Sequence, residues 1–137
     1  MSRGVSREQI ERVARIYKSN QDASQALGIA AGAFSRSVRY AKEREQFGHP
    51  LSDFQAIQWM LADAATEIQA ARLMVYWAAW LKGQGSNFTK EAAMAKLFAE
   101  QVLTRVSEMA LRIHGGIGYT KAYPLERHFR DARSFHF

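Results

Sequence analysis

Two short segments of this chain carry residue types that suit a phosphate-bearing ligand. Arg44 stands where a predicted helix ends, so its guanidinium can leave the helix surface, and its planar donors match the oxygens of a diphosphate. The run Gly115-Gly116-Ile117-Gly118 follows another predicted helix, and glycines let a ligand approach the backbone closely. Each segment alone is weak evidence, because an arginine at a helix end is often only a solvated side chain. Their value lies in occurring together.

Other kinds of catalytic and metal chemistry find little support in the sequence. The chain has no cysteine, which excludes disulfides and thiolate sites, and its four histidines lack the spacing of a metal site. Asp63 and Glu67 lie one helical turn apart, but no histidine accompanies them, so we predict a solvated or salt-bridged pair. We therefore expect no bound metal and no catalytic pair of carboxylates.

The elements that position these segments are predicted to be helices. Only two prolines interrupt the chain, and the stretches between them are rich in helix-forming residues with apolar side chains at helical spacing. The predicted helices cover about residues 6–17, 20–44, 52–82, 89–114 and 124–133. Long helices joined by short turns favour an all-α, up-down four-helix-type bundle. We assign residues 20–137 to this bundle and residues 1–19 to a short helical N-terminal extension.

Composition and charge limit the class of protein and its partners. A chain of 137 residues with 47% hydrophobic content is long enough for one domain with a real core. The net charge of +6 invites a polyanion, either nucleic acid or the phosphates of a nucleotide cofactor, although a solvated basic surface fits equally well. No apolar run approaches the roughly 20 residues that span a bilayer, and the N-terminus lacks a secretory signal. We expect a soluble, cytoplasmic protein without a membrane partner.

Three stretches together resemble the C-terminal helical domain of the acyl-CoA dehydrogenases, a family of FAD-dependent flavoenzymes. They are Tyr40–Gly48, Phe54–Asp63 and His114–Arg133, which follow one another in the order of that family. The resemblance implies the bundle fold predicted above. It also implies FAD as the cofactor and oxidation of an acyl-CoA as the family activity.

The resemblance also implies which residues contact the cofactor. In the family, the arginine at the position of Arg44 contacts the FAD pyrophosphate, often that of a neighbouring subunit, and the adenosine portion lies against the glycine loop. Arg112 stands where members usually have glutamine, and its added positive charge can serve a phosphate. The implied cofactor-binding residues are Arg44, Glu45, Gln46, Phe47, Gln55, Arg112, Gly115 and Gly116.

The resemblance covers only part of the family's catalytic machinery. Members remove the α-proton of an acyl-CoA with a glutamate while hydride passes to the flavin, and in many of them this glutamate lies just past the position of Phe137. We therefore expect no catalytic residue in the chain and no dehydrogenase activity for the chain alone. The implied role is a flavin half-site and subunit-assembly module. It would act as a homodimer or homotetramer, or with a protein that carries the missing domains.

Two other functions fit parts of the sequence. The first 38 residues look weakly like a helix-turn-helix DNA reader, with Gly28 at the turn and Arg36 and Arg39 on the second helix. This interpretation competes with a continuous bundle helix that contains Gly28. The other alternative is a purely structural oligomeric bundle, in which Trp77 and Trp80 fill the core or an interface between copies.

Overall fold

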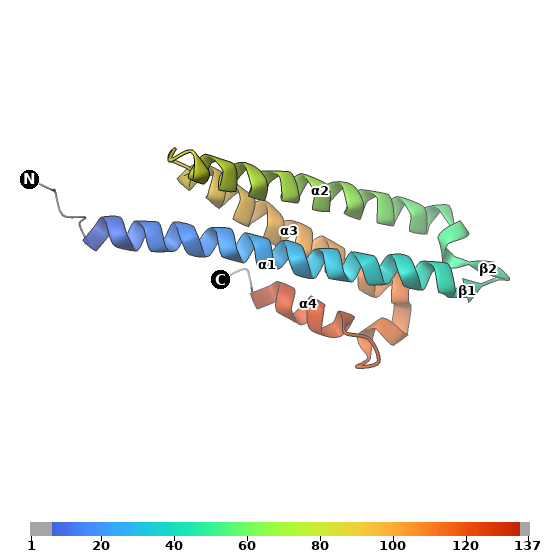
Figure 1. Cartoon of the computed structure of the whole chain (residues 1–137). Helices are drawn as coiled ribbons and strands as arrows, with labels where there is room; N and C mark the ends of the chain where they lie inside the picture. Colours follow the sequence, from blue (N-terminus) through green and yellow to red (C-terminus); the bar gives the residue numbers. More distant parts are fainter. Residues whose placement is uncertain (1–6, 135–137) are drawn as a thin grey trace, which may run out of the picture.

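The protein is described by a computed structural model that covers residues 7–134, with side chains described from residue 21 onward. Its elements are α1 (Arg7–Glu43), β1 (Glu45–Gln46), β2 (His49–Pro50), the 3-10 helix η1 (Leu51–Asp53), α2 (Gln55–Gly83), α3 (Thr89–His114), the 3-10 helix η2 (Gly115–Tyr119) and α4 (Leu125–Ser134). The three long helices lie alongside one another, and the short α4 packs below α1 (Figure 1). The all-α bundle predicted from the sequence is confirmed.

The core is built mainly from small residues, which let the helices approach closely. Along α1 the alanines at 23, 26, 30, 33 and 41 are fully buried, and α3 presents Val102, Leu103 and Val106 to the same core. Alanine at three- and four-residue spacing gives a helix a shallow ridge that fits the groove of its neighbour. Because α1 packs on α3 between Ala23 and Ala41, the segments that follow the C-terminal ends of both helices have a firm support.

Helix α1 corrects two predictions made from the sequence. We expected one helix to end near Tyr17 and another to begin near Asn20, but α1 runs through both positions without a break. Gly28 also lies inside α1, where it is exposed, so the turn that the helix-turn-helix interpretation requires does not exist. A glycine inside a helix costs about 1 kcal/mol of stability relative to alanine. The helix tolerates this cost because burial of the alanines on either side of Gly28 stabilises it. The division of the chain at residue 19 stays a prediction.

The start of α2 also differs from the prediction. We expected Ser52 to cap a helix over residues 52–82, but Ser52 lies in η1 and its carbonyl accepts a hydrogen bond from the Gln58 side chain at 2.9 Å. The boundaries of α3 match the prediction, with Asn87 Oδ1 accepting hydrogen bonds from the Thr89 amide and hydroxyl just before the helix. No helix within residues 7–134 combines the length and apolar character needed to cross a membrane.

Candidate functional site

Arg44 lies between the last turn of α1 and a short β-hairpin. Its amide donates a hydrogen bond to the carbonyl of Tyr40 at 2.8 Å, and its own carbonyl accepts one from the amide of Leu51 at 2.8 Å. The backbone of Arg44 is therefore held on both sides. Its side chain is exposed and makes no hydrogen bond or ion pair with the other described residues. The guanidinium is available to a ligand.

The tip of the hairpin carries an exposed aromatic residue in an unfavourable backbone conformation. Phe47 and Gly48 join β1 to β2, and both have positive φ, 54° and 80°, as a type I′ turn requires. Gly48 adopts this conformation freely, whereas a bulky side chain does so at a cost of about 1–2 kcal/mol. The Phe47 ring is 90% exposed and meets only the edge of the Phe54 ring, with 6.3 Å between centroids. Backbone strain of this kind recurs at functional sites, which makes Phe47 a candidate for binding.

The glycine loop after α3 divides into an open part and a packed part. Gly115 ends the helix with φ 62° and ψ −146°, a conformation that glycine adopts readily but that differs from a left-handed helical cap. A methyl group added at Gly115 or Gly116 would meet nothing within 4 Å, so the backbone of both residues faces open space. A methyl group at Gly118 would lie 2.7 Å from Cβ of His114. The first two glycines therefore leave room for a ligand, and the third lets the loop pack against α3.

An aromatic cluster connects the arginine end of α1 with the glycine loop. The rings of Tyr40 and His114 are stacked, with 4.1 Å between centroids and 22° between planes. Tyr123 meets both rings edge-on, at 5.7 Å from Tyr40 and 5.1 Å from His114. No sequence pattern pointed to this cluster, because its members lie far apart in the chain and only the packing of α1 on α3 brings them together.

The candidate cofactor-binding residues lie at one end of the bundle and are all exposed. Arg44, Glu45, Gln46 and Phe47 belong to the end of α1 and the hairpin, Gln55 is the first residue of α2, and Arg112, Gly115 and Gly116 are at the end of α3 (Figure 1). Arg112 forms an ion pair with Glu108, with 3.1 Å between Nη2 of Arg112 and Oε1 of Glu108. Of the two arginine candidates, Arg44 is thus the one whose charge is not already compensated.

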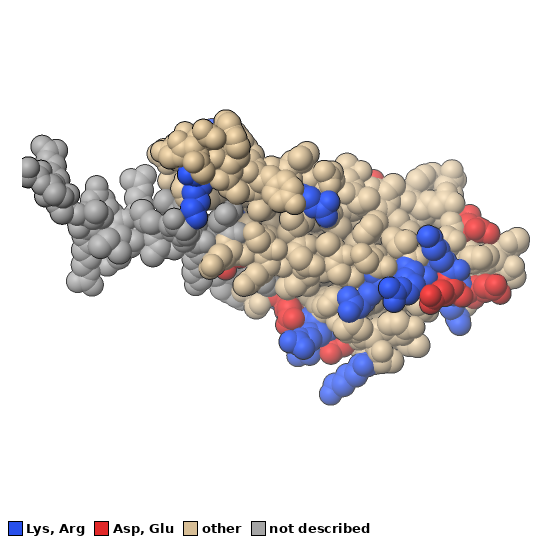
Figure 2. Space-filling view, viewed as in Figure 1, with Lys and Arg blue, Asp and Glu red and all other residues tan. Residues whose placement is uncertain are grey.

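The basic surface near this end is partly neutralised. Lys and Arg side chains gather over the C-terminal half of α1 and over α4, with acidic neighbours among them (Figure 2). On α4, Arg130 is paired with Glu126 at 2.8 Å and Arg127 with Asp131 at 3.5 Å. A uniform basic stripe of the kind that nucleic acid requires is therefore not present on α4.

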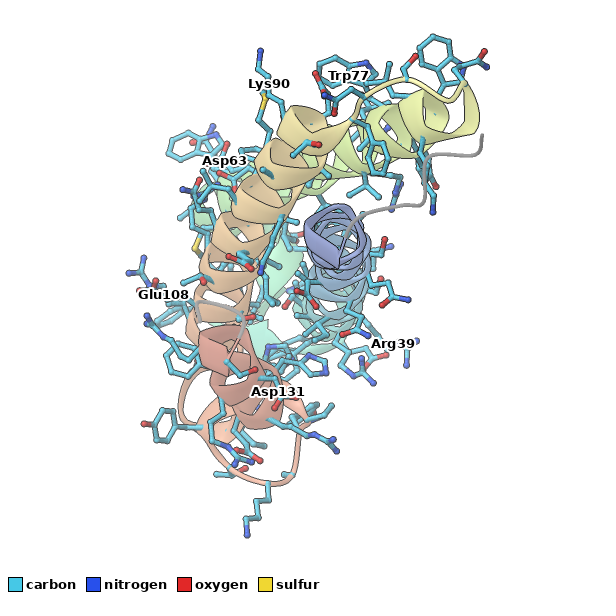
Figure 3. The ribbon with its side chains drawn as sticks, turned by 90° about the vertical axis from the view of Figure 1, so that its left-hand side faces the viewer. Arg39, Asp63, Trp77, Lys90, Glu108 and Asp131 are labelled. Atoms are coloured by element: carbon cyan, nitrogen blue, oxygen red, sulfur yellow. The ribbon has the colours of Figure 1, made fainter. Side chains whose placement is uncertain are left out.

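A hollow of about 260 Å³ lies between α2 and α3 on another side of the bundle. Asp63, Glu67 and Glu108 contribute to its lining, and Asp63 and Glu108 lie on the side of the molecule opposite to Arg39 (Figure 3). Glu67 is salt-bridged to Arg105, whose Nε lies 2.8 and 2.9 Å from its carboxylate oxygens, as the sequence predicted for one member of the pair. Arg105 and the candidate residue Arg112 also line the hollow, but each is paired with a carboxylate. Asp63 then leaves the lining with a negative charge, so the unpaired Arg44 suits a diphosphate better.

Two half-buried or buried histidines give the bundle a pH dependence. Burial lowers the pKa of His114 below its ordinary value of 6.5, against the opposing effect of its hydrogen bond to Ala110, and burial together with Arg36 lowers the pKa of His128. Below about pH 6.5 the unfolded chain binds protons that the folded chain does not, so the free energy of unfolding falls as the pH drops.

We expect a lower melting temperature at about pH 5.5 than at about pH 7. His114→Phe and His128→Phe together should reduce this difference, and an unchanged difference would contradict the assignment.

The fold and the site define an all-α domain that presents an unpaired arginine, exposed aromatic rings and an open glycine loop at one end, as a phosphate-bearing aromatic ligand requires. The sequence profile described as "Acyl-CoA dehydrogenase, C-terminal domain" matches residues 21–137. The chain therefore belongs to the acyl-CoA dehydrogenase family.

Individual relatives agree with this assignment. The chain is 58% identical over 111 residues to a probable acyl-CoA dehydrogenase of Bacillus subtilis, covering 81% of this chain and 29% of that protein. It is 50% identical over 113 residues to a subunit of the caffeyl-CoA reductase-Etf complex of Acetobacterium woodii, covering 82% and 30%. The structure of butyryl-CoA dehydrogenase from Megasphaera elsdenii superimposes with a TM-score of 0.91 at 44% identity, covering 93% of this chain and 33% of that chain. The chain thus spans about 30% of the length of the curated relatives it matches.

Proposed function

We propose that this chain holds the adenosine diphosphate portion of FAD, as the helical half of a flavin site in an acyl-CoA flavoenzyme. The observation that carries the proposal is the position of Arg44, exposed and unpaired, at the same end of the bundle as the open backbone of Gly115 and Gly116. The guanidinium supplies planar donors for a diphosphate, and the missing side chains at Gly115 and Gly116 let a ligand approach the backbone there, although the Gly115 amide itself donates to carbonyls at the end of α3.

The other residues at this end fit the rest of such a ligand. Phe47 and Phe54 offer an apolar surface on which a base can stack, and the Gln55 amide and Arg112 add polar contacts. When FAD is bound, its flavin supplies the hydride acceptor of the family's chemistry. Because the chain covers about 30% of its relatives, we assign the flavin ring and the acyl thioester to protein parts outside these residues. A protein that carries those parts is the corresponding partner.

Isothermal titration with FAD, ADP and FMN tests this function. A site for the adenosine diphosphate portion binds FAD and ADP and does not bind FMN, which shares the flavin ring but lacks the adenosine. ADP should also compete with FAD. Binding of FMN with the affinity of FAD would contradict the proposal, as would a folded chain that binds neither FAD nor ADP.

Phe47 provides a prediction in which stability and binding change in opposite directions. Asparagine tolerates positive φ far better than phenylalanine, so Phe47→Asn should raise the free energy of unfolding by about 1 kcal/mol. The same change removes the exposed ring and should weaken FAD binding several-fold. Phe47→Leu is the matched control, because it removes the ring and keeps the strained turn. If Phe47→Asn bound FAD as well as the wild type, the ring would have no part in the site.

A second role, assembly with another copy of the chain, is favoured by an uncharged outer face of α2. Leu73, Tyr76, Trp77 and Trp80 are each about half exposed or more, and Arg72 is the only charged residue between Ile68 and Leu81. Trp77 and Asp131 lie on opposite sides of the molecule when it is viewed along the bundle (Figure 3). Contiguous exposed aromatic side chains on a soluble bundle favour contact with a partner. A homodimer or homotetramer would cover this face.

Sedimentation velocity can test self-association through α2. Trp80→Glu places a charge on the exposed aromatic face and should weaken self-association roughly tenfold or more. Gln21→Glu, at an exposed position of α1, adds the same charge on another helix and should leave the assembly intact. A wild-type chain that sediments as a monomer at every concentration would exclude this role, as would a Trp80→Glu chain that sediments like the wild type.

A further inference from the structure

His114 is a buried histidine whose ring plane is fixed by the helix that carries it. Its side chain is 4% exposed, and Nδ1 lies 2.8 Å from the carbonyl oxygen of Ala110. A carbonyl oxygen only accepts, so Nδ1 carries a proton in this bond. Burial lowers the pKa of His114, which favours the neutral ring with Nε2 as an acceptor. Nε2 is buried and has no hydrogen-bond partner among the described residues. The ring is thus held from one side by a hydrogen bond and presents its flat face to α1.

The face of His114 lies against Tyr40, and both residues adjoin the proposed cofactor site. Tyr40 is one turn before Arg44, and its carbonyl accepts the Arg44 amide at 2.8 Å. His114 immediately precedes Gly115, and its Cβ is the atom that a methyl group at Gly118 would meet. The stack of 4.1 Å between ring centroids therefore joins the backbone that positions Arg44 to the backbone of the glycine loop.

On this basis we infer that the Tyr40–His114 stack is a positioning device that fixes the spacing between Arg44 and the Gly115–Gly116 loop. The inference rests on the proposed FAD site. Neither ring needs to touch the cofactor. Their role is to keep two binding elements from different helices at a fixed separation, which reduces the ordering that binding would otherwise require.

Variants on both sides of the stack test this role. His114→Leu and Tyr40→Leu keep apolar bulk and remove the ring contact, and each should weaken FAD and ADP binding about 5- to 20-fold. The double variant should be weaker than either single variant by no more than about twofold, since both remove the same interaction. Tyr40→Phe keeps the ring and should bind as the wild type does. Val102→Ala, in the core of α3 and away from the loop, should lower the melting temperature without changing the dissociation constant.

Amide hydrogen exchange gives a readout that does not depend on the cofactor. In both leucine variants, exchange of the Arg44 and Gly115 amides should accelerate together by about tenfold, while Tyr40→Phe and Val102→Ala leave them protected. A wild-type chain that fails to bind FAD would overturn the proposed function, and coupled exchange would then still establish the mechanical connection. Additive binding losses in the double variant would overturn the inference. So would exchange that changes on one side of the stack only.

Discussion

Arg44→Ala is expected to weaken FAD binding roughly 10- to 100-fold and to leave the melting temperature unchanged. Charge-assisted hydrogen bonds to a diphosphate contribute about 1.5–3 kcal/mol, which corresponds to that range of affinity. The fold should not respond, because the Arg44 side chain is exposed and unpaired with the other described residues. Its structural contribution comes from backbone hydrogen bonds to Tyr40 and Leu51, which alanine also makes. Isothermal titration and thermal unfolding of the same sample measure both quantities.

Two further variants test whether the loss of affinity in Arg44→Ala comes from this one guanidinium. Arg44→Lys keeps the charge and loses the planar pair of donors, so its affinity should lie between those of the wild type and the alanine variant. Arg39→Ala removes a charge from an exposed position on α1, one to two turns before Arg44, and should weaken binding only slightly. Equal losses from Arg44→Ala and Arg39→Ala would mean that the net charge of the chain, and not a site at the end of α1, attracts the cofactor.

Alanine substitutions at Gly118 and Gly116 should have opposite consequences. At Gly118 the new methyl group would lie 2.7 Å from Cβ of His114, which is not a flexible side-chain tip, so the loop or the helix end must move. We expect a loss of about 1–3 kcal/mol in the free energy of unfolding. At Gly116 the methyl group has open space and the backbone does not have positive φ, so the stability should stay the same or rise by about 0.5 kcal/mol.

The affinity for FAD should also respond to the substitution at Gly116. The added methyl group of Gly116→Ala occupies the open space where the proposed ligand approaches, so FAD affinity should fall while the fold remains intact. Thermal unfolding and titration of the two variants side by side check both statements. A Gly116→Ala chain that binds FAD normally would remove the glycine loop from the site. A fully stable Gly118→Ala chain would contradict the packing assigned to Gly118.

The sequence predicted best those features that depend on local spacing. Helix α3 was placed with its observed ends, because Thr89 and Gly115 bound a long run with apolar residues at helical spacing. The break expected near Asn20 was wrong, because the buried alanines that follow it pack on α3 and this packing outweighs the weak local signals for a helix end. The hairpin after α1 was missed, since strands of two residues have no periodicity and Phe47-Gly48 lacks the usual asparagine of a type I′ turn.

The candidate site shows the same division between local and long-range information. Arg44 and the glycine loop could be singled out by residue type and by resemblance, and the structure brings them to one end of the bundle. Their assignment to FAD remains a prediction. The stack of Tyr40 on His114 could not be foreseen, because neither residue type predicts a partner on another helix. The strain at Phe47 was equally inaccessible, since it depends on backbone conformation.

The most direct test of the proposed site is a map of amide chemical shifts in the labelled chain during titration with ADP. We expect saturable shifts at Arg44, Phe47, Gly115 and Gly116, and none around Gly85 in the turn between α2 and α3 at the other end of the bundle. Such a pattern would place the adenosine diphosphate portion of the cofactor at the end of α1. Shifts confined to the turn between α2 and α3, or to the acidic hollow near Asp63, would contradict the account, as would a folded chain whose spectrum ADP leaves unchanged.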